Sequence, residues 1–331
     1  MLTTRLTESL GLTRPIVLAP MASGATSGHL AAAVCEAGGL GMFGGIHRGG
    51  PEWVREQIRV VRSRASGLWG VGFITWWIPA LEANFQACLD EGVPVIAFSF
   101  GDPTKYIARA KAAGAKVLCQ VQTMESAREA LDAGADVLVV QGNEAGGHTG
   151  QLGTLPFLTQ VLEMSQTTPV IASGGIGNGR ALAAVLAAGG EGAWIGTLLL
   201  ATHEAIEMSE AYKKCIVESD GQDTVFTRVY DILYDLPFPD GIAGRARTNQ
   251  FTREWHGRDA EVLQRREELA ARFPAARAPF DRDPDIHPIW MGQSAGSVHG
   301  VRSVAEVIEE LCDGAERLLR ERSRALVTSR T

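Results

Sequence analysis

The residues with the clearest capacity for chemistry lie in one glycine-rich loop, Gln141–His148. The loop ends in Ala145-Gly146-Gly147-His148, so a histidine follows two glycines shortly after the apolar run that ends at Gln141. Glycines leave room for a flat ligand, and an imidazole works near neutral pH as a base or a hydrogen-bond donor. The alternative is a loop histidine that only caps or packs. The position of the loop after a predicted strand favours chemistry, so we predict His148 as the catalytic residue.

Two more turns are suited to an anion. The stretch Ser173–Gly179 contains four glycines and leads into a helical stretch beginning at Arg180, and a second small turn with a hydroxyl group follows at Ile195-Gly196-Thr197. Glycine lets backbone N–H groups approach an anion closely, and a helix N-terminus adds a favourable dipole. A single turn of this kind serves chain reversal just as well. Two of them on consecutive strands predict a ligand that carries phosphate.

The other reactive side chains carry less information. No second histidine or carboxylate pair stands at ligand spacing from His148, which argues against a metal. His47 follows the second predicted strand and could face the pocket, while Trp76 and Trp77 either wall an apolar pocket or pack internally. The five cysteines form no CxxC pair, which indicates a reducing compartment rather than a disulfide framework or a zinc site.

These motifs are spaced by a repeating pattern of short apolar runs and Ala-rich amphipathic stretches. Eight runs are predicted to be strands, and between them lie helical stretches such as 29–37, 52–63, 78–90, 106–113 and 125–133. Uniformly apolar strands alternating with helices predict a parallel sheet, and eight units favour a closed (β/α)8 TIM barrel over an open doubly wound sheet. No glycine-rich dinucleotide fingerprint follows the first run, which also disfavours the open sheet. The eight runs are Ile16–Ala19, Leu40–Phe43, Gly70–Ile74, Pro94–Phe98, Lys116–Gln120, Val137–Gln141, Pro169–Ala172 and Ala193–Gly196.

Three regions are expected along the chain. Residues 1–221 form the barrel, and residues 222–300 form a small helical or irregular subdomain with a charged helix near 259–272. Residues 301–331 contain a final amphipathic helix, 303–320, that packs back on the barrel. We expect the subdomain to cover the C-terminal face of the barrel, where pocket walls are found. The alternative is a peripheral decoration without a catalytic role.

Charge and composition limit the partners. The chain has 331 residues, is 45% hydrophobic and carries a formal charge of −7. It has no basic block to neutralise phosphates, so nucleic acid and an anionic membrane surface are not expected partners. The N-terminus has no apolar targeting segment and no run has membrane-spanning length, which leads us to expect a cytoplasmic protein. The sequence is compatible with a homodimer.

Taken together, these motifs resemble the nitronate monooxygenase (2-nitropropane dioxygenase) family of FMN-dependent barrels. The resemblance extends from about Leu6 to Gly300. The segments that carry it are Pro20-Met21, Gln141–His148, Ile171–Ile176, Ile195–Thr197, Gly244–Asn249 and Gly292–Gly296. As a set they are specific for the family, and less specific for one activity within it.

The resemblance implies roles for individual residues. His148 would be the catalytic base or the polarising group that faces the substrate. Ala19 and Met21 would contact the flavin ring through their backbone, and Gln120 and Gln141 would lie near the ring. Gly146 and Gly147 would run against it. The residues that would hold the FMN phosphate are Ser173, Gly174, Gly175, Gly196 and Thr197.

Two positions depart from the family pattern. Many members carry asparagine where this chain has Gly72, and some relatives place lysine where it has Gln120. A cation near a reduced flavin stabilises its negative charge, so its loss should alter the redox potential. These departures bear on the substrate more than on the fold or the cofactor.

The resemblance implies an FMN enzyme that oxidises alkyl nitronates with O2 to a carbonyl compound and nitrite. His148 would deprotonate a neutral nitroalkane or hydrogen-bond the nitro oxygens. Two alternatives remain. One is an NAD(P)H-dependent flavin reductase of quinones or enoyl thioesters, because related barrels share the flavin site. The other is a phosphate-binding barrel without flavin or catalysis.

Overall fold

The computed structural model describes residues 2–276 and 282–326, and its centre is a closed barrel of eight parallel strands. Parallel bridging between Val17 and Leu40 joins the first strand to the second and closes the sheet. The predicted (β/α)8 fold is therefore confirmed, and each predicted run overlaps a strand, with ends that differ by at most one residue. In chain order the barrel strands are β1 (Ile16–Leu18), β2 (Gly41–Gly44), β3 (Trp69–Ile74), β4 (Val95–Ser99), β5 (Lys116–Val121), β6 (Val137–Gln141), β8 (Val170–Ser173) and β9 (Ala193–Ile195).

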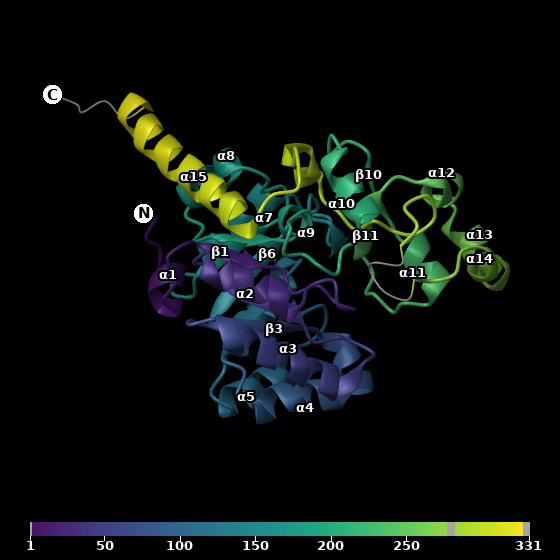
Figure 1. The fold of residues 1–331 in the computed structure, drawn as a ribbon, viewed down its shortest axis with the longest axis horizontal. Coiled ribbons are helices and arrows are strands. Elements are labelled where there is room, and N and C mark those ends of the chain that lie inside the picture. The colour runs from purple at the N-terminus through teal and green to yellow at the C-terminus, as the bar shows by residue number, and fades with distance from the viewer. Residues whose placement is uncertain (1, 277–281, 327–331) are drawn as a thin grey trace.

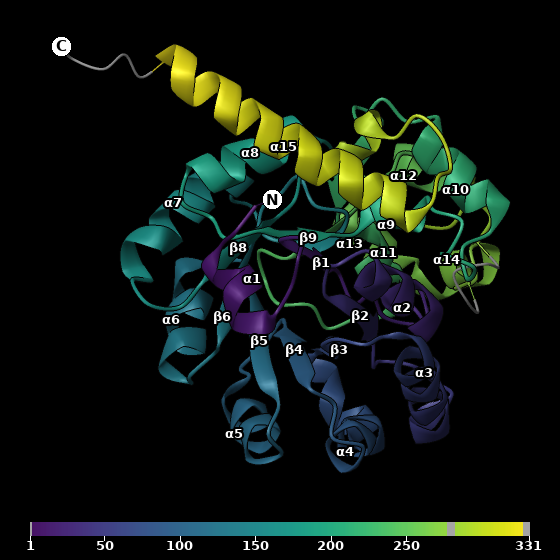
Figure 2. The same cartoon turned by 60° about the vertical axis from the view of Figure 1, so that its left-hand side comes forward.

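Helices surround the barrel, as Figure 2 shows. Buried apolar residues on both faces of the strands pack against these helices outside and against one another inside. The start of helix α6 is determined by its own sequence, because Thr123 and Ser126 form a reciprocal capping box there. The elements outside the strands are α2 (Gly28–Glu36), α3 (Gly50–Arg64), η1 (Thr75–Leu81), α4 (Glu82–Asp90), α5 (Thr104–Ala112), α6 (Met124–Asp132), α7 (Thr154–Met164), α8 (Gly179–Ala187) and α9 (Thr197–Leu200).

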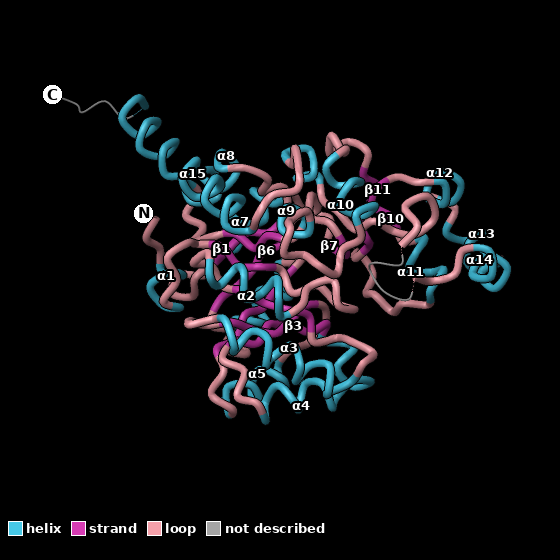
Figure 3. The backbone as a smooth tube through the Cα atoms, in the orientation of Figure 1, coloured by secondary structure: helices cyan, strands magenta, loops and turns pink. Residues whose placement is uncertain are grey.

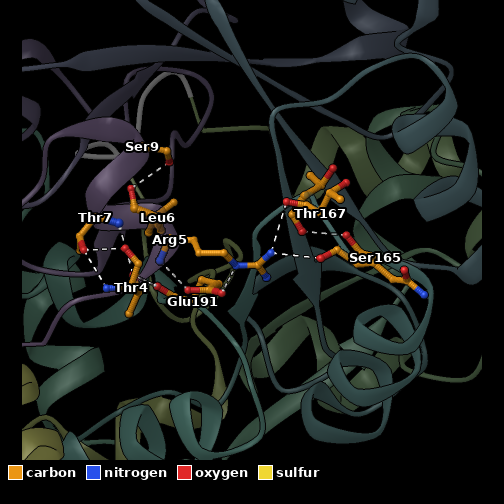
Figure 4. A network of polar contacts seen from close by, with 10 residues as sticks. Thr4, Arg5, Leu6, Thr7, Ser9, Ser165, Thr167 and Glu191 are labelled. Carbon is orange, nitrogen blue, oxygen red and sulfur yellow. Dashed lines mark hydrogen bonds and ion pairs between the residues drawn. The ribbon is translucent and has the colours of Figure 1, made fainter.

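Helix α1 (Arg5–Leu10) closes the N-terminal mouth of the barrel. Its Leu6 and Leu10 belong to the same buried cluster as the side chains inside the barrel. The Arg5 backbone N–H donates to the Glu191 carboxylate at 2.8 Å, and the Arg5 guanidinium donates to the carbonyl of Thr167 at 3.3 Å (Figure 4). Among the described residues, α1 therefore covers this end of the barrel, and the opposite, C-terminal end is left for a ligand to enter.

The chain beyond the barrel forms a second small sheet that the sequence pattern did not predict. Strand β11 (Ala243–Arg247) pairs antiparallel with β10 (Thr224–Thr227) on one side and with β7 (Gly147–Thr149) on the other. Figure 3 shows β7 beside β10 and β11. Strand β7 belongs to the loop that carries His148, so this sheet connects the later segment to that loop.

The remaining helices of this segment lie at the end of the barrel opposite α1 (Figure 1). The elements are α10 (Glu210–Val217), α11 (Val229–Tyr234), α12 (Gln250–Trp255), α13 (Asp259–Gln264), α14 (Arg266–Arg272) and η3 (Gln293–Ser297). Helices α11 to α14 have a core of their own, in which Tyr230, Phe251 and Trp255 are buried, whereas α10 and η3 pack against the main core. The charged helix expected near 259–272 is present as two helices that meet at Arg265.

The final helix, α15 (Val304–Leu326), packs across α8, as Figure 2 shows. It begins where the sequence predicted and runs six residues beyond the expected end at Arg320. The expected regions 222–300 and 301–331 include residues 277–281 and 327–331, which lie outside the described residues. Within the described part of the chain, no helix is both long and apolar enough to cross a membrane.

The contact between α8 and α15 depends on Gly179. A Cβ at this position would lie 2.7 Å from backbone atoms of Gly314. Overpacking of this kind costs about 1–3 kcal/mol. We therefore expect Gly179→Ala to lower the thermal unfolding midpoint by several degrees, measured by circular dichroism. Gly300→Ala is the control, because its Cβ would meet nothing within 4 Å. Equal midpoints for the two variants would contradict this account of the contact.

Candidate active site

A cavity of about 670 Å³ opens at the C-terminal ends of the barrel strands. Its wall includes residues from the ends of the barrel strands or the loops that follow them, and residues from α11 and the segments around it. All twelve residues predicted from the sequence lie on the wall of this one cavity. They are Ala19, Met21, Gln120, Gln141, Gly146, Gly147, His148, Ser173, Gly174, Gly175, Gly196 and Thr197.

The turn after β8 contains two consecutive glycines with positive φ angles. Gly174 and Gly175 have φ angles of +105° and +72°, a region that side-chain-bearing residues rarely adopt. A Cβ on Gly174 would lie 2.9 Å from Thr154 Oγ1, the hydroxyl that donates to the Gly174 carbonyl. The first N–H groups of α8 already donate to the Asn178 side chain. Anion binding here would therefore rely on the turn itself more than on the helix.

The second turn is joined to the His148 loop by the segment 291–293. The Gly292 N–H donates to Thr197 Oγ1 at 3.0 Å, which leaves the hydroxyl proton of Thr197 available for a ligand. The next N–H, of Gln293, donates to the Glu144 carbonyl. A Cβ on Gly146 would lie 2.5 Å from the Gly292 nitrogen. Glycine at 146 and 292 thus permits a close backbone contact that fixes the loop relative to the Thr197 turn.

Two buried glutamines position the His148 backbone. Gln122 Nε2 donates to Gln141 Oε1 at 2.9 Å, and Gln141 Nε2 donates to the His148 carbonyl at 2.9 Å. The third glutamine, Gln120, is also buried and lies on the cavity wall. Gln122 was not identified from the sequence, where nothing distinguished it from a polar residue at a strand end.

The His148 side chain is held on several sides. Its Nε2 lies 2.6 Å from Asp231 Oδ1 of α11. Its ring stacks on Phe238 with centroids 3.5 Å apart and planes within 8°. The Trp290 ring lies 5.2 Å away at 45°, in space that Gly244 leaves open because a Cβ there would be 2.3 Å from that indole. These partners all come from the segment after the barrel, so His148 lies at the junction of the two parts.

Asp231, Phe238 and Trp290 were missed by the sequence analysis. The one available signal was for Asp231, a single carboxylate in the otherwise apolar run Val229–Tyr234. Such a residue is rarely buried without a partner. Identifying that partner required the fold, because 83 positions separate Asp231 from His148.

Gly72 packs closely against the first loop. A Cβ at Gly72 would lie 2.2 Å from Cγ of Pro20, so the proline ring fills the space that a larger side chain needs. Next to it, the Met21 N–H donates to Thr26 Oγ1 at 2.8 Å. Any polar contact from Met21 to a ligand would therefore come from another atom.

The structure shows which of the other residues singled out in the sequence lie on the cavity wall. His47 stacks on Trp53 at 3.9 Å and accepts from the Gly49 N–H, and it is not among the cavity residues. Burial lowers the pKa of His47 below its usual value. Trp77 lies on the cavity wall, whereas Trp76 stacks on it at 5.0 Å. Trp77 is therefore part of the cavity wall, as one interpretation of the sequence expected, and Trp76 packs internally, as the other expected.

The cavity wall also carries charged and phenolic side chains. Three arginines, Arg48, Arg266 and Arg282, lie on its wall. Burial lowers the pKa of Arg282 and raises that of nearby Tyr212 to about 12. Among residues 2–276 and 282–326, no group of three or more His, Cys, Asp or Glu side chains is placed to hold a metal ion.

Comparison with known proteins identifies relatives of this chain along nearly its whole length. The family model for nitronate monooxygenase matches residues 4–73 and 79–314. A probable nitronate monooxygenase of Staphylococcus aureus (strain Newman) is 30% identical, covering 88% of this chain and 91% of that protein. The nitronate monooxygenase of Paraburkholderia phytofirmans is 29% identical, with 93% and 95% covered.

Solved structures show the same likeness in three dimensions. FabK from Thermotoga maritima superposes with a TM-score of 0.87 and 32% identity, covering 99% of this chain and all of that one. A nitroalkane oxidase from Streptomyces ansochromogenes has a TM-score of 0.77 and 29% identity, with 96% and 99% covered. With the barrel, the cavity and its glycine turns, these matches show that the chain is an oxidoreductase of the nitronate monooxygenase family.

Proposed function

We propose that this enzyme uses FMN to oxidise alkyl nitronates with O2, giving a carbonyl compound and nitrite. The observation that carries the proposal is that His148 and the two turns predicted to bind phosphate, Ser173–Gly175 and Gly196–Thr197, lie on the wall of one cavity. A pocket whose wall has both turns suited to an anion and a group that can transfer a proton suits a phosphorylated cofactor with a small substrate beside it.

The residues present fit FMN. Gly147 has a φ of +72°, and a Cβ there would meet nothing within 4 Å, so the chain leaves open space beside His148 where a flat ring system can lie. The Gly174–Gly175 turn and the Thr197 hydroxyl would hold the phosphate, while Ala19 and Met21 would lie against the ring. Bound FMN would supply the chemistry of accepting electrons from the substrate and passing them to O2.

The protein's part in the reaction is to orient the substrate and manage one proton. His148 would hydrogen-bond the nitro oxygens of a bound nitronate, or take a proton from the carbon of a neutral nitroalkane. Phe238, Trp290 and Phe100 surround its ring with apolar surface, which limits the access of water and strengthens electrostatic contacts in the pocket.

Steady-state assays test the proposal. We expect the purified protein to release FMN on denaturation, and to consume O2 and form nitrite when supplied with a primary or secondary alkyl nitronate. A colourless protein without bound flavin that also fails to bind added FMN would contradict the proposal. So would a flavoprotein that forms no nitrite from any nitronate.

A second candidate function is the NAD(P)H-dependent reduction of quinones or enoyl thioesters. Arg48 and Arg282 favour retaining it, because guanidinium groups on the cavity wall are suited to the phosphates of a nucleotide co-substrate, whereas Arg266 already pairs with Asp235. Nitronates are also anions, so these arginines serve both candidates. The choice of reductant separates the two functions.

A further inference from the structure

The buried carboxylate of Asp231 has a single described partner that explains its position. The side chain is 4% exposed, and its Oδ1 lies 2.6 Å from His148 Nε2. Its Oδ2 is buried without a hydrogen-bond partner among the described residues. An unpaired carboxylate in an apolar setting is costly. Among the described residues, the contact with His148 is therefore the interaction that offsets the cost of burying the Asp231 carboxylate.

Attachment of the later segment to the barrel does not require Asp231. Strands β7 and β11 already pair along Gly147–Thr149. Arg245 adds a hydrogen bond from its Nε to the Asn143 carbonyl at 2.7 Å. These contacts hold the two parts together without Asp231. A role in attaching the segment to the barrel therefore does not explain why a carboxylate is buried at this position.

The geometry determines which nitrogen of His148 carries the proton. A carboxylate only accepts hydrogen bonds, so Nε2 donates to Asp231 and Nδ1 is left with its lone pair. The ring cannot easily turn away, because Phe238 stacks on it and Trp290 lies beside it. Nδ1 is then the basic atom that this side chain offers to the cavity.

We infer that Asp231 is a positioning residue that holds His148 as the Nε2–H tautomer, so that Nδ1 takes a proton from a neutral nitroalkane. The inference rests on the proposed function. In this step the substrate C–H bond breaks and its proton forms an N–H bond at Nδ1. The electron pair of the C–H bond becomes the C=N bond of the nitronate, and Asp231 stabilises the resulting imidazolium. No oxidant takes part in this step.

Asp231→Asn in the FMN-loaded enzyme tests the inference through substrate discrimination. A nitronate has already lost the proton in question, so we expect its kcat to fall by less than about threefold. The kcat for the parent nitroalkane should fall by about 100-fold, the scale of general base catalysis. Asp240→Asn, a fully exposed carboxylate of the same segment, is the matched control.

The ring nitrogens of His148 give a second readout that needs no turnover. In ¹⁵N-histidine-labelled wild-type protein, assigned by comparison with His148→Asn, we expect an Nε2–H tautomer. This measurement holds even if the Asp231 variant does not fold. An Nδ1–H tautomer, or equal losses with nitronate and nitroalkane in Asp231→Asn, would overturn the inference. If the wild-type enzyme oxidises neither substrate, both the proposed function and the role of His148 as a base are wrong. The ¹⁵N spectrum then tests by itself whether Asp231 holds His148 in the Nε2–H tautomer.

Discussion

Replacing His148 by asparagine is expected to lower kcat for neutral nitroalkanes by about 10²–10⁴-fold, the range that a general base contributes. Asparagine can donate a hydrogen bond to a nitro oxygen but cannot take a proton from carbon. With a preformed nitronate the loss should be smaller, about tenfold. The comparison needs initial rates with both forms of one substrate, measured before they interconvert.

Flavin content separates chemistry from binding in this variant. The imidazole lies beside the Gly147 region but is not part of the turns assigned to the phosphate, so His148→Asn should retain its FMN. His256→Asn, at an exposed position outside the cavity, is the control. Full nitroalkane activity in His148→Asn would show that the role assigned to His148 is wrong.

The second large effect is expected at Gly174. Alanine there must adopt a φ near +105° and place a Cβ 2.9 Å from Thr154 Oγ1 and the Gly142 carbonyl oxygen. A strained backbone of this kind costs about 1–3 kcal/mol. If the turn relaxes to avoid that strain, its N–H groups no longer converge on the phosphate. We therefore expect Gly174→Ala to weaken FMN binding by about 10- to 100-fold, measured by fluorescence titration of the apoprotein.

Gly114→Ala is the matched control for that experiment. Gly114 has a φ of +84°, but a Cβ there would meet nothing within 4 Å, and it precedes β5 at the closed end of the barrel. It should lower the thermal midpoint and leave FMN affinity unchanged. Equal FMN affinities for the two variants would remove Gly174 from the proposed phosphate site.

The barrel and its two glycine turns were predictable from the sequence for a physical reason. A parallel strand buried on both faces is apolar over nearly its whole length, as in Val137–Val140 of β6, and such runs are distinct from amphipathic helices. The order of eight such runs then assigns each loop to one end of the barrel. The place of Ser173–Gly175 and Thr197 follows from that order, because the loops after the seventh and eighth strands are where barrels commonly bind phosphate.

The partners of His148 could not be predicted in the same way. Strand β11 contains the polar sequence Gly244-Arg245-Ala246-Arg247, whose strand conformation depends on pairing with β7 about a hundred positions earlier. Phe238 and Trp290 contact His148 from the same later segment, 90 or more positions along the chain. His47 illustrates the opposite case: its position after β2 suggested a pocket residue, yet stacking on Trp53 holds it outside the cavity.

Anaerobic mixing tests the central claim most directly, with the absorbance of protein-bound flavin as the readout. In separate experiments, the FMN-loaded enzyme is mixed without oxygen with an alkyl nitronate, with NADH and with NADPH. The account predicts rapid bleaching of the flavin by the nitronate, slow or no bleaching by the nicotinamides, and nitrite formation once O2 is admitted. Rapid bleaching by NADH or NADPH with none by the nitronate would contradict it and assign the cavity to a reductase.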